Sequence, residues 1–385
     1  MAELKGFIMK FLFASDSFKG TLSSEKTVEL LSRAANEVFP GCICSGIPLA
    51  DGGEGTVNAL VNACHGVLVK TPVSGPLMEN ILATYGILGG DKAIIEMAAA
   101  AGLTLIPDDK RNPLNTTTYG VGELILDAAK HGCRDISVAI GGSGTNDGGM
   151  GCARALGVRF FDNNGGELAC FGKDLIRVSR IDTSGINPAI RECRFTIMCD
   201  VTNPLCGLDG ATLTYGKQKG GTPETLAELE RGMLNYRSRI YELTGTDCNL
   251  VSGAGAAGGL GVALSVFCNG EMKSGIETVL DLICFDDMIK DVDLVVTGEG
   301  RLDYQSCFGK AVYGIGVHCK MAGVPAIALV GSVGEGAEEI FKYGIGSIMT
   351  TVDSPMTLEE ALEHAEELYY SAAVRMFRMI KIGRG

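Results

Sequence analysis

Charged and hydroxyl side chains follow several apolar runs of this sequence at the points where the runs end. Asp16, Ser17 and Lys19 follow the run "KFLFA". The stretch "DGGEGT", which begins at Asp51, follows "IPLA", and Arg301 lies in "GEGRLD" after "DLVVT". Turns and helix caps would account for any one of these stretches, but caps need neither Lys nor Arg. Together they predict a binding site for a charged ligand at the carboxyl ends of parallel strands.

A second group of polar residues lies in the glycine-rich stretch "AIGGSGTNDGGMG", between the run "ISVAI" and a helical pattern. The backbone N–H groups of Gly141, Gly142 and Gly144, with the hydroxyls of Ser143 and Thr145, would cradle a phosphate at the start of that helix. The stretch is not a Walker A loop, because no Lys-Ser/Thr follows the glycines. A strand-to-helix turn without a ligand is the alternative.

The stretch "MCDVTNPLCG" places a carboxylate directly after the apolar run "FTIM". Asp200 is the carboxylate, with Thr202 and Asn203 beside it. A carboxylate in this position is a candidate base for a hydroxyl proton. An Asx turn into Pro204 is the structural alternative.

Two other motifs have weaker functional interpretations. Lys217 and Lys219 in "YGKQKGG" are expected on the solvated surface near a loop. The letters "GAGAAG" at residues 253–258 fit the dinucleotide fingerprint G-x-G-x-x-G, but the preceding "NLVS" is a poor strand. A tightly packed segment of small residues, or one that lines a cleft, is favoured there.

Alternating strand and helix patterns position the first set of residues at both ends of the chain. Near the N-terminus the predicted order is a strand, a helix over residues 23–37, a second strand and a second helix. Near the C-terminus "VDLVVTGEG", "PAIALVGSV" and "IGSIMTTV" are predicted strands, and a closing helix covers about residues 355–379. This alternation is typical of a doubly wound parallel sheet.

The middle of the chain has a different pattern. "GVLVKTPVSGPLMENILATYGIL" and "DKAIIEMA" predict antiparallel strands joined by turns. We therefore expect an α/β protein with a discontinuous Rossmann- or flavodoxin-like domain, residues 1–68 and 290–385, into which a second α/β domain, residues 69–289, is inserted. The active site is expected in the cleft between these domains.

Composition excludes several classes of protein. Of the 385 residues, 46% are hydrophobic and 21% are charged, so a large core is available and disorder is not expected. The formal net charge of -13 argues against a nucleic-acid partner. An anionic substrate remains compatible with this charge, because a local cluster of cations can bind one.

The cysteine pattern and the N-terminus predict a cytoplasmic protein without a membrane anchor. The 14 cysteines include no C-x-x-C, and many lie in apolar runs, so we interpret them as reduced thiols and not as zinc ligands or disulfides. No secretory signal and no apolar run of about 20 residues is seen. Residues 1–8 are interpreted as a leader or an alternative start, since Met9 begins a strand pattern.

Ten motifs occur in the order seen in the bacterial glycerate kinase family, which the sequence closely resembles from Met9 to near its C-terminus. They are "SDSFKGTLSS", "LADGGEGT", "VSGPL", "IEMAAAAGL", "TTTYGVGELI", "IGGSGTNDGGMG", "CDVTNPLCG", "QKGG", "GAGAAGGLG" and "VTGEGRLDYQS". Motifs as long as "GGSGTNDGG" are highly specific. The resemblance is to the class that forms 2-phosphoglycerate, and it implies two α/β domains with ATP-dependent, Mg²⁺-dependent phosphorylation of D-glycerate. Departures are small; Tyr215, Lys217 and Tyr304 stand where the family commonly has other residues.

The resemblance also implies roles for particular residues. Lys19 and Arg301 would clamp the glycerate carboxylate or the moving phosphoryl group, and Asp200 would accept the proton of the substrate hydroxyl. Mg²⁺ prefers oxygen ligands. The carboxylates expected to hold it are Asp51, Glu299 and Asp303. The residues expected to contact substrate or phosphate are Asp16, Ser17, Gly52, Gly53, Gly142, Ser143, Gly144, Thr145, Asn146 and Asn203.

Several alternatives stay open at this point. One alternative is a kinase that gives 3-phosphoglycerate or acts on a related hydroxy acid, and a more distant alternative is an NAD-dependent oxidoreductase built on "GAGAAG". A non-catalytic sugar-acid-binding protein with the same fold is a further alternative. The expected partners are ATP and the small-molecule substrate, without nucleic acid or membrane; a homodimer is left open.

Overall fold

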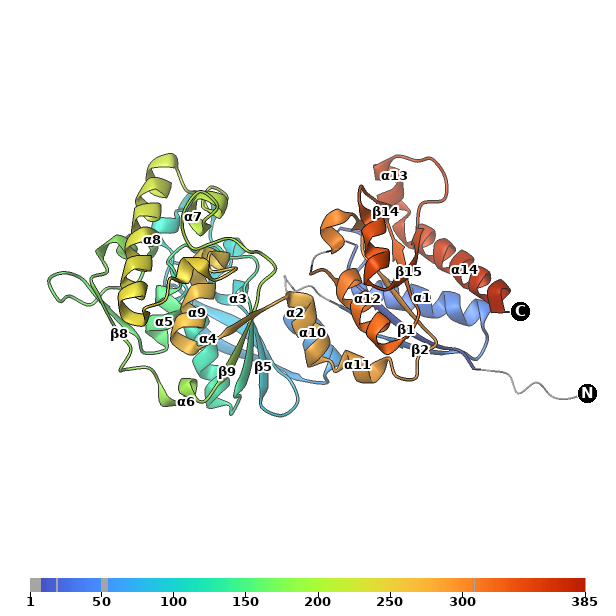
Figure 1. The fold of residues 1–385 in the computed structure, drawn as a ribbon, viewed down its shortest axis with the longest axis horizontal. Helices are drawn as coiled ribbons and strands as arrows, with labels where there is room; N and C mark the ends of the chain where they lie inside the picture. Colours follow the sequence, from blue (N-terminus) through green and yellow to red (C-terminus); the bar gives the residue numbers. More distant parts are fainter. Residues whose placement is uncertain (1–7, 19, 50–54, 308, 385) are drawn as a thin grey trace, which may run out of the picture. The chain divides into compact units, whose positions relative to one another are not determined.

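The structure of the chain is a computed structural model, drawn in Figure 1, and it describes most of the sequence. The described residues are 8–18, 20–49, 55–307 and 309–384. Four residues that the sequence places in the site lie outside these ranges, so their roles stay predictions: Lys19, Asp51, Gly52 and Gly53.

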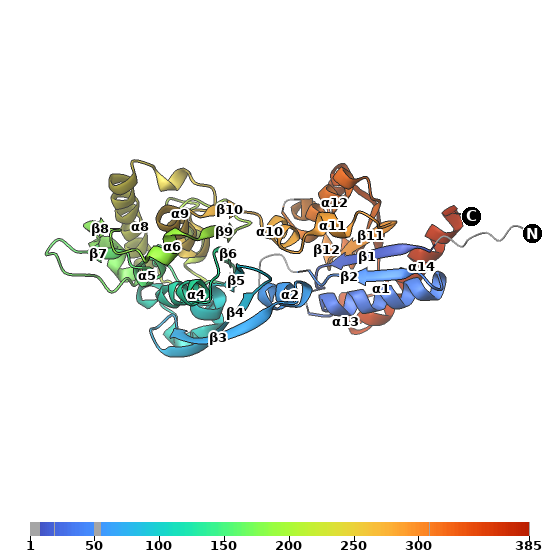
Figure 2. The same ribbon diagram turned by 90° about the horizontal axis from the view of Figure 1, so that it is seen from below.

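The chain divides into two compact units. The split unit comprises Met1–Asp51 and Val279–Gly385, and the continuous unit comprises Gly52–Thr278. The domain limits expected from the sequence, at residues 68 and 289, lie further along the chain in both cases. Helix α2 (Thr56–Ala63) belongs with the continuous unit because it packs against two strands of that unit's sheet, β4 (Asn80–Ile87) and β5 (Lys92–Glu96) (Figure 2).

The split unit is built on a five-stranded sheet in which every neighbouring pair is parallel. The strand order is β15-β13-β11-β1-β2. Numbered along this unit, the order is 2-1-3-4-5, which is the flavodoxin-like order of doubly wound sheets. The predicted fold class is confirmed. The strands are β1 (Lys10–Ser15), β2 (Ile43–Gly46), β11 (Leu294–Gly298), β13 (Ala326–Val330) and β15 (Ile345–Thr350).

The first strand and helix form as the sequence predicts. All residues of β1 after Lys10 are buried, as expected for a parallel strand covered on both faces. Helix α1 (Ser24–Val38) begins after Ser23, whose hydroxyl accepts a hydrogen bond from the amide of Lys26. This N-cap satisfies one of the amides that the first helical turn leaves unpaired.

The predicted closing helix is two helices in the structure. Helix α13 (Leu358–Glu363) ends at His364, where φ is -100° and ψ is 21°. These angles depart from helical values, so the chain turns before α14 (Ala365–Arg384) begins. The other helices of the split unit are α11 (Phe285–Met288), α12 (Ala311–Ala322) and two 3₁₀ helices, Tyr304–Cys307 and Ala337–Tyr343.

Aromatic packing holds α14 against the sheet and α1. The ring of Phe377 in α14 lies 5.1 Å from that of Phe11 in an edge-to-face arrangement, and Phe13 is also in this cluster. Tyr369, about two helical turns before Phe377 in α14, is fully buried and packs edge-to-face on Phe18. The cluster fixes α14 along the sheet and so positions the residues that follow β1.

The continuous unit has a mixed six-stranded sheet. Its order is β10-β9-β6-β5-β4-β3; the first four strands are parallel, whereas β4 and β3 are antiparallel. The predicted antiparallel hairpin is therefore present. The strands are β3 (Val67–Ser74), β4 (Asn80–Ile87), β5 (Lys92–Glu96), β6 (Asp135–Ala139), β9 (Arg194–Met198) and β10 (Glu271–Lys273).

Helices and two short outer strands complete this unit. A buried cluster that includes Val121, Ile136 and Leu260 joins the sheet to its helices. The helices are α3 (Ala98–Ala101), α4 (Tyr119–Lys130), α5 (Met150–Ala155), α6 (Pro188–Arg191), α7 (Ala211–Tyr215), α8 (Pro223–Thr244) and α9 (Leu260–Cys268), and the outer strands are β7 (Arg159–Phe161) and β8 (Arg180–Asp182). Helix α10 (Gly275–Leu282) crosses the boundary between the units, which falls after Thr278. Across the described residues, no helix combines the length and apolar character that crossing a membrane requires.

Candidate active site

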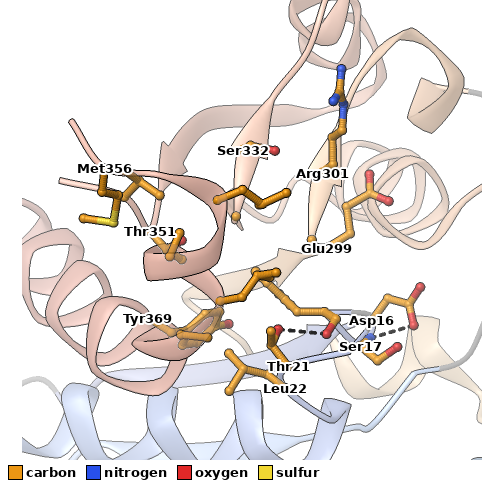
Figure 3. A pocket seen from close by; sticks show the side chains of 18 of the residues that line it. Asp16, Ser17, Thr21, Leu22, Glu299, Arg301, Ser332, Thr351, Met356 and Tyr369 are labelled. Carbon is orange, nitrogen blue, oxygen red and sulfur yellow. Dashed lines mark hydrogen bonds between the residues drawn. The ribbon is translucent and has the colours of Figure 1, made fainter. Parts of the chain in front are cut away.

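A pocket of about 630 Å³ lies at the carboxyl end of the split unit's sheet. Residues that follow β1, β11, β13 and β15 line it (Figure 3). Strands β1 and β11 meet where the strand order reverses direction, and sheets of this order bind ligands at that point. Asp16 and Glu299, which follow these two strands, therefore take the position that the sequence predicts for ligand-binding residues.

One half of the pocket is polar and holds both signs of charge. Arg301 Nε lies 3.5 Å from Asp303 Oδ2, and Asp303 Oδ1 accepts a hydrogen bond from the amide of Gln305 at 3.0 Å. Strands β12 (Arg301–Leu302) and β14 (Ser332–Val333) form a short parallel ladder that fixes the backbone at Arg301. The charged residues of this polar half are Asp16, Glu299, Arg301, Asp303 and Lys310.

Glu299 is the most buried carboxylate of the polar half. It is 7% exposed, and its Oε1 has no hydrogen-bond partner among the described residues. Burial raises the pKa of Glu299 above its ordinary value of 4.5, while Ser306 and Lys310 oppose that rise. Lys310 Nζ lies 3.9 Å from Oε2. A buried carboxylate oxygen without a partner is a place where a cation or a donor would bind.

The polar half suits a magnesium ion bound together with phosphate. Three carboxylates line it, those of Asp16, Glu299 and Asp303. Within the described ranges, no three His, Cys, Asp or Glu residues lie close enough to hold a metal by themselves. Mg²⁺ usually takes only one or two protein carboxylates and fills its other positions with phosphate oxygens and water. The donor set therefore fits Mg²⁺ as a nucleotide complex.

The other half of the pocket is apolar, and the sequence did not predict it. Phe18 and Leu22 contribute to it from the segment between β1 and α1. Leu358 and Leu362 contribute from α13, where their spacing of four residues places them on one helix face. The pocket thus joins a charged half to an apolar half within one unit.

In the continuous unit, the glycine-rich loop is largely buried. The amide of Gly144 donates to the carbonyl of Ala101 at 2.9 Å, and the side chains of Thr145 and Asn146 are fully buried. Thr145 Oγ1 and Asn146 Oδ1 have no partner in the described part of the chain. The accessible members of the predicted set are Gly141 and Gly142, which are exposed, and Ser143, which is half-buried.

The start of helix α5 is occupied by a carboxylate of the protein. Asp147 Oδ1 accepts from the amide of Gly149 at 3.0 Å, and Oδ2 accepts from the amide of Gly151 at 3.2 Å and from the hydroxyl of Thr118 at 2.8 Å. Asp147 is fully buried, and burial raises its pKa although these hydrogen bonds oppose the rise. In the structure, amides at the start of α5, where the sequence predicts a phosphate site, therefore donate to the carboxylate of Asp147.

A buried lysine donates a hydrogen bond to Ser143. Lys219 is 1% exposed, and its Nζ donates to Ser143 Oγ at 2.8 Å and to the carbonyl of Thr145 at 2.7 Å. Burial lowers the pKa of Lys219 to about 7, and the negative charge of Asp147 opposes that shift. The expectation of a solvated Lys219 is wrong. Because Lys219 holds Ser143, it belongs to the polar centre of this unit.

Asp200 and Asn203 occupy the loop after β9. Asp200 is exposed, and its Oδ1 accepts from the amide of Gly275 at 2.9 Å and the hydroxyl of Ser274 at 3.0 Å, at the first turn of α10. Asn203 donates to the carbonyl of Asp209 at 2.8 Å and accepts from the hydroxyl of Tyr215 at 2.7 Å. Both side chains thus have hydrogen bonds that organise the loop, and their predicted roles toward a substrate stay predictions.

The "GAGAAG" segment is a packing element. A short 3₁₀ helix at Cys248–Leu250, and not a strand, precedes it. Gly258 has φ of 66°, its carbonyl accepts from the amide of Gly148, and a Cβ there would lie 2.2 Å from the carbonyl oxygen of Thr145. Only glycine permits this close approach. The structure therefore gives no support to the dinucleotide fingerprint, while it confirms tight packing of small residues.

The described site residues fall into separate groups. The pocket of the split unit brings together Asp16, Ser17, Glu299, Arg301 and Asp303, and the loop of the continuous unit brings together Gly142, Ser143, Gly144, Thr145 and Asn146. Sequence reasoning missed Lys310 as a pocket residue. Its position directly before helix α12 was the available signal.

Comparisons with known proteins agree on one family. The model of the "Glycerate kinase family" matches residues 11–381. A glycerate kinase of Bacillus subtilis (strain 168) is 41% identical over 98% of this chain and 99% of its own length. A glycerate 2-kinase of Escherichia coli (strain K12) is also 41% identical, over 97% of this chain and 99% of its own length.

A solved structure gives the same result for the fold. The crystal structure of "putative glycerate kinase 2" from Salmonella typhimurium LT2 superposes with a TM-score of 0.88 and is 38% identical. The match covers 98% of this chain and 100% of that one. The fold is therefore shared over essentially the full extent of both chains.

Proposed function

This chain belongs to the glycerate kinase family, and we propose that it transfers the terminal phosphoryl group of ATP to the 2-hydroxyl group of D-glycerate, giving 2-phosphoglycerate. Membership makes it a kinase whose acceptor is an alcohol group. The finer parts of the proposal are the donor ATP, its Mg²⁺ ion and the position of the product phosphate.

The observation that carries the proposal is the polar half of the pocket in the split unit. Phosphoryl transfer requires charge neutralisation and positioning more than covalent chemistry. The polar half offers three carboxylates and two cations at the carboxyl end of a parallel sheet. This composition fits the phosphates of a nucleotide bound with Mg²⁺.

Glu299 and Asp303 would hold the ion, which when bound neutralises charge on the phosphates. Lys310, 3.9 Å from Glu299, and Arg301, which is exposed toward solvent, would attract phosphate oxygens. Arginine suits two parallel hydrogen bonds to a phosphate or carboxylate, and lysine acts as a compact charge.

In the proposed reaction the 2-hydroxyl oxygen of glycerate forms a bond to the γ-phosphorus of ATP. The bond from that phosphorus to the oxygen shared with the β-phosphate breaks, and ADP leaves. The hydroxyl proton goes to a base, for which Asp200 stays our candidate. Ser143, whose hydroxyl oxygen accepts a hydrogen bond from Lys219, would donate to an oxygen of the bound phosphate or acid.

The choice of the 2-hydroxyl rests on relatives. The E. coli relative that is 41% identical carries the name glycerate 2-kinase. A kinase acting on the 3-hydroxyl would use the same charged groups, so the product decides between the two.

The direct test is ADP release that depends on both D-glycerate and Mg²⁺. We expect Glu299→Gln to lower kcat by roughly 10²–10³-fold, because it removes a preorganised charge from the phosphate site. Glu338→Gln is the matched control, since Glu338 is exposed and lies outside the pocket of the same unit. The proposal fails if the wild-type enzyme releases no ADP with D-glycerate, or if Glu299→Gln and Glu338→Gln retain equal activity.

A further inference from the structure

The apolar half of the pocket exposes leucine side chains that no part of the described chain covers. Leu358 is 74% exposed and Leu362 is 48% exposed, and both line the pocket from one face of α13. Met356 and Ala361 extend the same surface. Single exposed leucines are common on protein surfaces, but here they line a cavity together with Leu22, which is also apolar.

D-glycerate does not match this wall. It is a small acid with hydroxyl groups on its other carbons, so contact with leucine and methionine would leave its polar groups unsatisfied. A cavity of about 630 Å³ also lies in the size range of sites that enclose a much larger ligand. The pocket therefore suits a ligand that has a flat, largely apolar group for the apolar half, covalently joined to an anion for the polar half.

A nucleotide has that chemistry. Its base is planar and buries well against aliphatic side chains, and its phosphates need the cations and ion-binding carboxylates of the polar half. Figure 3 shows the two halves in one pocket, with Met356 and Tyr369 on one side and Arg301 and Glu299 on the other. Oε1 of the buried Glu299, which has no hydrogen-bond partner among the described residues, marks the phosphate end independently of the apolar wall.

We infer that the wall formed by Leu22, Met356, Leu358 and Leu362 binds the base of the nucleotide, with the phosphates directed toward Glu299 and Lys310. The inference rests on the proposed function, because it takes ATP as the phosphoryl donor. It assigns nucleotide recognition to the split unit, and to α13 in particular.

Two substitutions on α13 test this assignment. Leu358→Gln and Leu362→Gln replace exposed apolar side chains with polar ones of similar size, so little change in folding stability is expected. The matched control is Leu250→Gln, because Leu250 is 84% exposed and lies in the continuous unit. Titration calorimetry would measure the Kd of ADP with Mg²⁺ and, separately, the Kd of inorganic tripolyphosphate with Mg²⁺, which has no base.

We expect each α13 substitution to raise the Kd of ADP roughly tenfold and to leave the Kd of tripolyphosphate unchanged. Steady-state kinetics should show a matching rise in the KM for ATP, with the KM for D-glycerate unchanged. The control should match wild type in every measurement.

Equal ADP affinity in wild type and in both α13 variants would overturn the inference, and so would a rise in the KM for D-glycerate without a rise for ATP. These outcomes are distinct from failure of the proposed function, in which the wild-type enzyme does not phosphorylate D-glycerate at all. If the wild-type enzyme makes phosphoglycerate and the α13 variants bind ADP normally, the proposed function stands, but the base does not bind at this wall.

Discussion

Glu299 and Lys219 are buried ionisable side chains at the polar centres of the two units. Burial raises the pKa of Glu299 and lowers that of Lys219 to about 7, so in both cases the environment opposes the charged form. Glu299 has one oxygen without a hydrogen-bond partner in the described part of the chain, whereas both hydrogen bonds of Lys219 go to the glycine-rich loop. Glu299 is therefore suited to bind a ligand, and Lys219 to position Ser143.

Lys219 predicts a pH dependence of folding stability. Its ordinary pKa is 10.5, so between about pH 7 and 10.5 the unfolded chain binds a proton that the folded protein has released. The contribution of this residue to the free energy of unfolding therefore rises with pH across that window, by up to about 1.4 kcal/mol per pH unit.

Urea denaturation of wild type and Lys219→Met at pH 7, 8 and 9 would measure this contribution. The stability difference between the two proteins should shift in favour of wild type as the pH rises. Lys217→Met is the control, because Lys217 is exposed two residues away. Equal pH slopes for wild type and Lys219→Met would contradict the buried, proton-releasing state of this lysine.

Asp200 has two roles that substitution can separate. Its carboxylate accepts from the amide of Gly275, and asparagine keeps an oxygen acceptor there but cannot take a proton. If Asp200 is the base, Asp200→Asn should lower kcat by about 10²–10⁴-fold with little change in Tm. Asp200→Ala should in addition destabilise the protein, by about 1 kcal/mol.

Thermal denaturation and steady-state kinetics of the two Asp200 variants would give both quantities. Full activity of Asp200→Asn would show that Asp200 is not the base and that its role is limited to capping α10.

The secondary-structure elements that carry the split-unit site could be predicted largely from the sequence. Buried parallel strands give continuous apolar runs, and Ser23 gives a clear N-cap, so β1 and α1 were expected almost to the residue. The break at His364 was not expected, because the residues around it continue a helical pattern. That break makes α13 a separate helix, and α13 supplies the apolar wall of the pocket.

Helix α13 depends on its first turn. Thr357 Oγ1 accepts from the amide of Glu360 at 3.2 Å, and Glu360 Oε2 accepts from the amide of Thr357 at 2.8 Å, which is a capping box. A helix of this length has few other hydrogen bonds, so the cap contributes much of its stability.

Thr357→Ala should therefore raise amide hydrogen-exchange rates in α13 about fivefold, corresponding to about 1 kcal/mol. Thr357→Ser keeps the hydroxyl and should restore slow exchange. Hydrogen exchange followed by mass spectrometry would measure both variants. Faster exchange in both, or in neither, would show that the cap does not control this helix.

For the molecule as a whole, the sequence indicated the fold class, and its motifs indicated the family. It did not indicate which polar residues would be buried. Thr145 and Asn146 look like loop residues, yet both are fully buried, because "GAGAAG" closes over them through the contact of Gly258 with Thr145. Lys219 likewise looks like a surface residue in the sequence. Its burial could not be predicted, because it depends on segments far away in the chain.

The apolar wall was missed for a related reason. Leucines at a spacing of four residues predict a helix face packed in a core, and nothing local distinguishes such a face from one that lines a cavity. Only the arrangement of α13 over the ends of the strands reveals the difference.

The measurement that tests the central claim most directly is identification of the product. The protein would be incubated with ATP, Mg²⁺ and D-glycerate, and the phosphorylated acid would be resolved by ³¹P and ¹³C NMR. We expect 2-phosphoglycerate together with ADP in equal amounts. The appearance of 3-phosphoglycerate would contradict the proposed choice of hydroxyl, and the absence of any phosphoglycerate would contradict the proposed reaction.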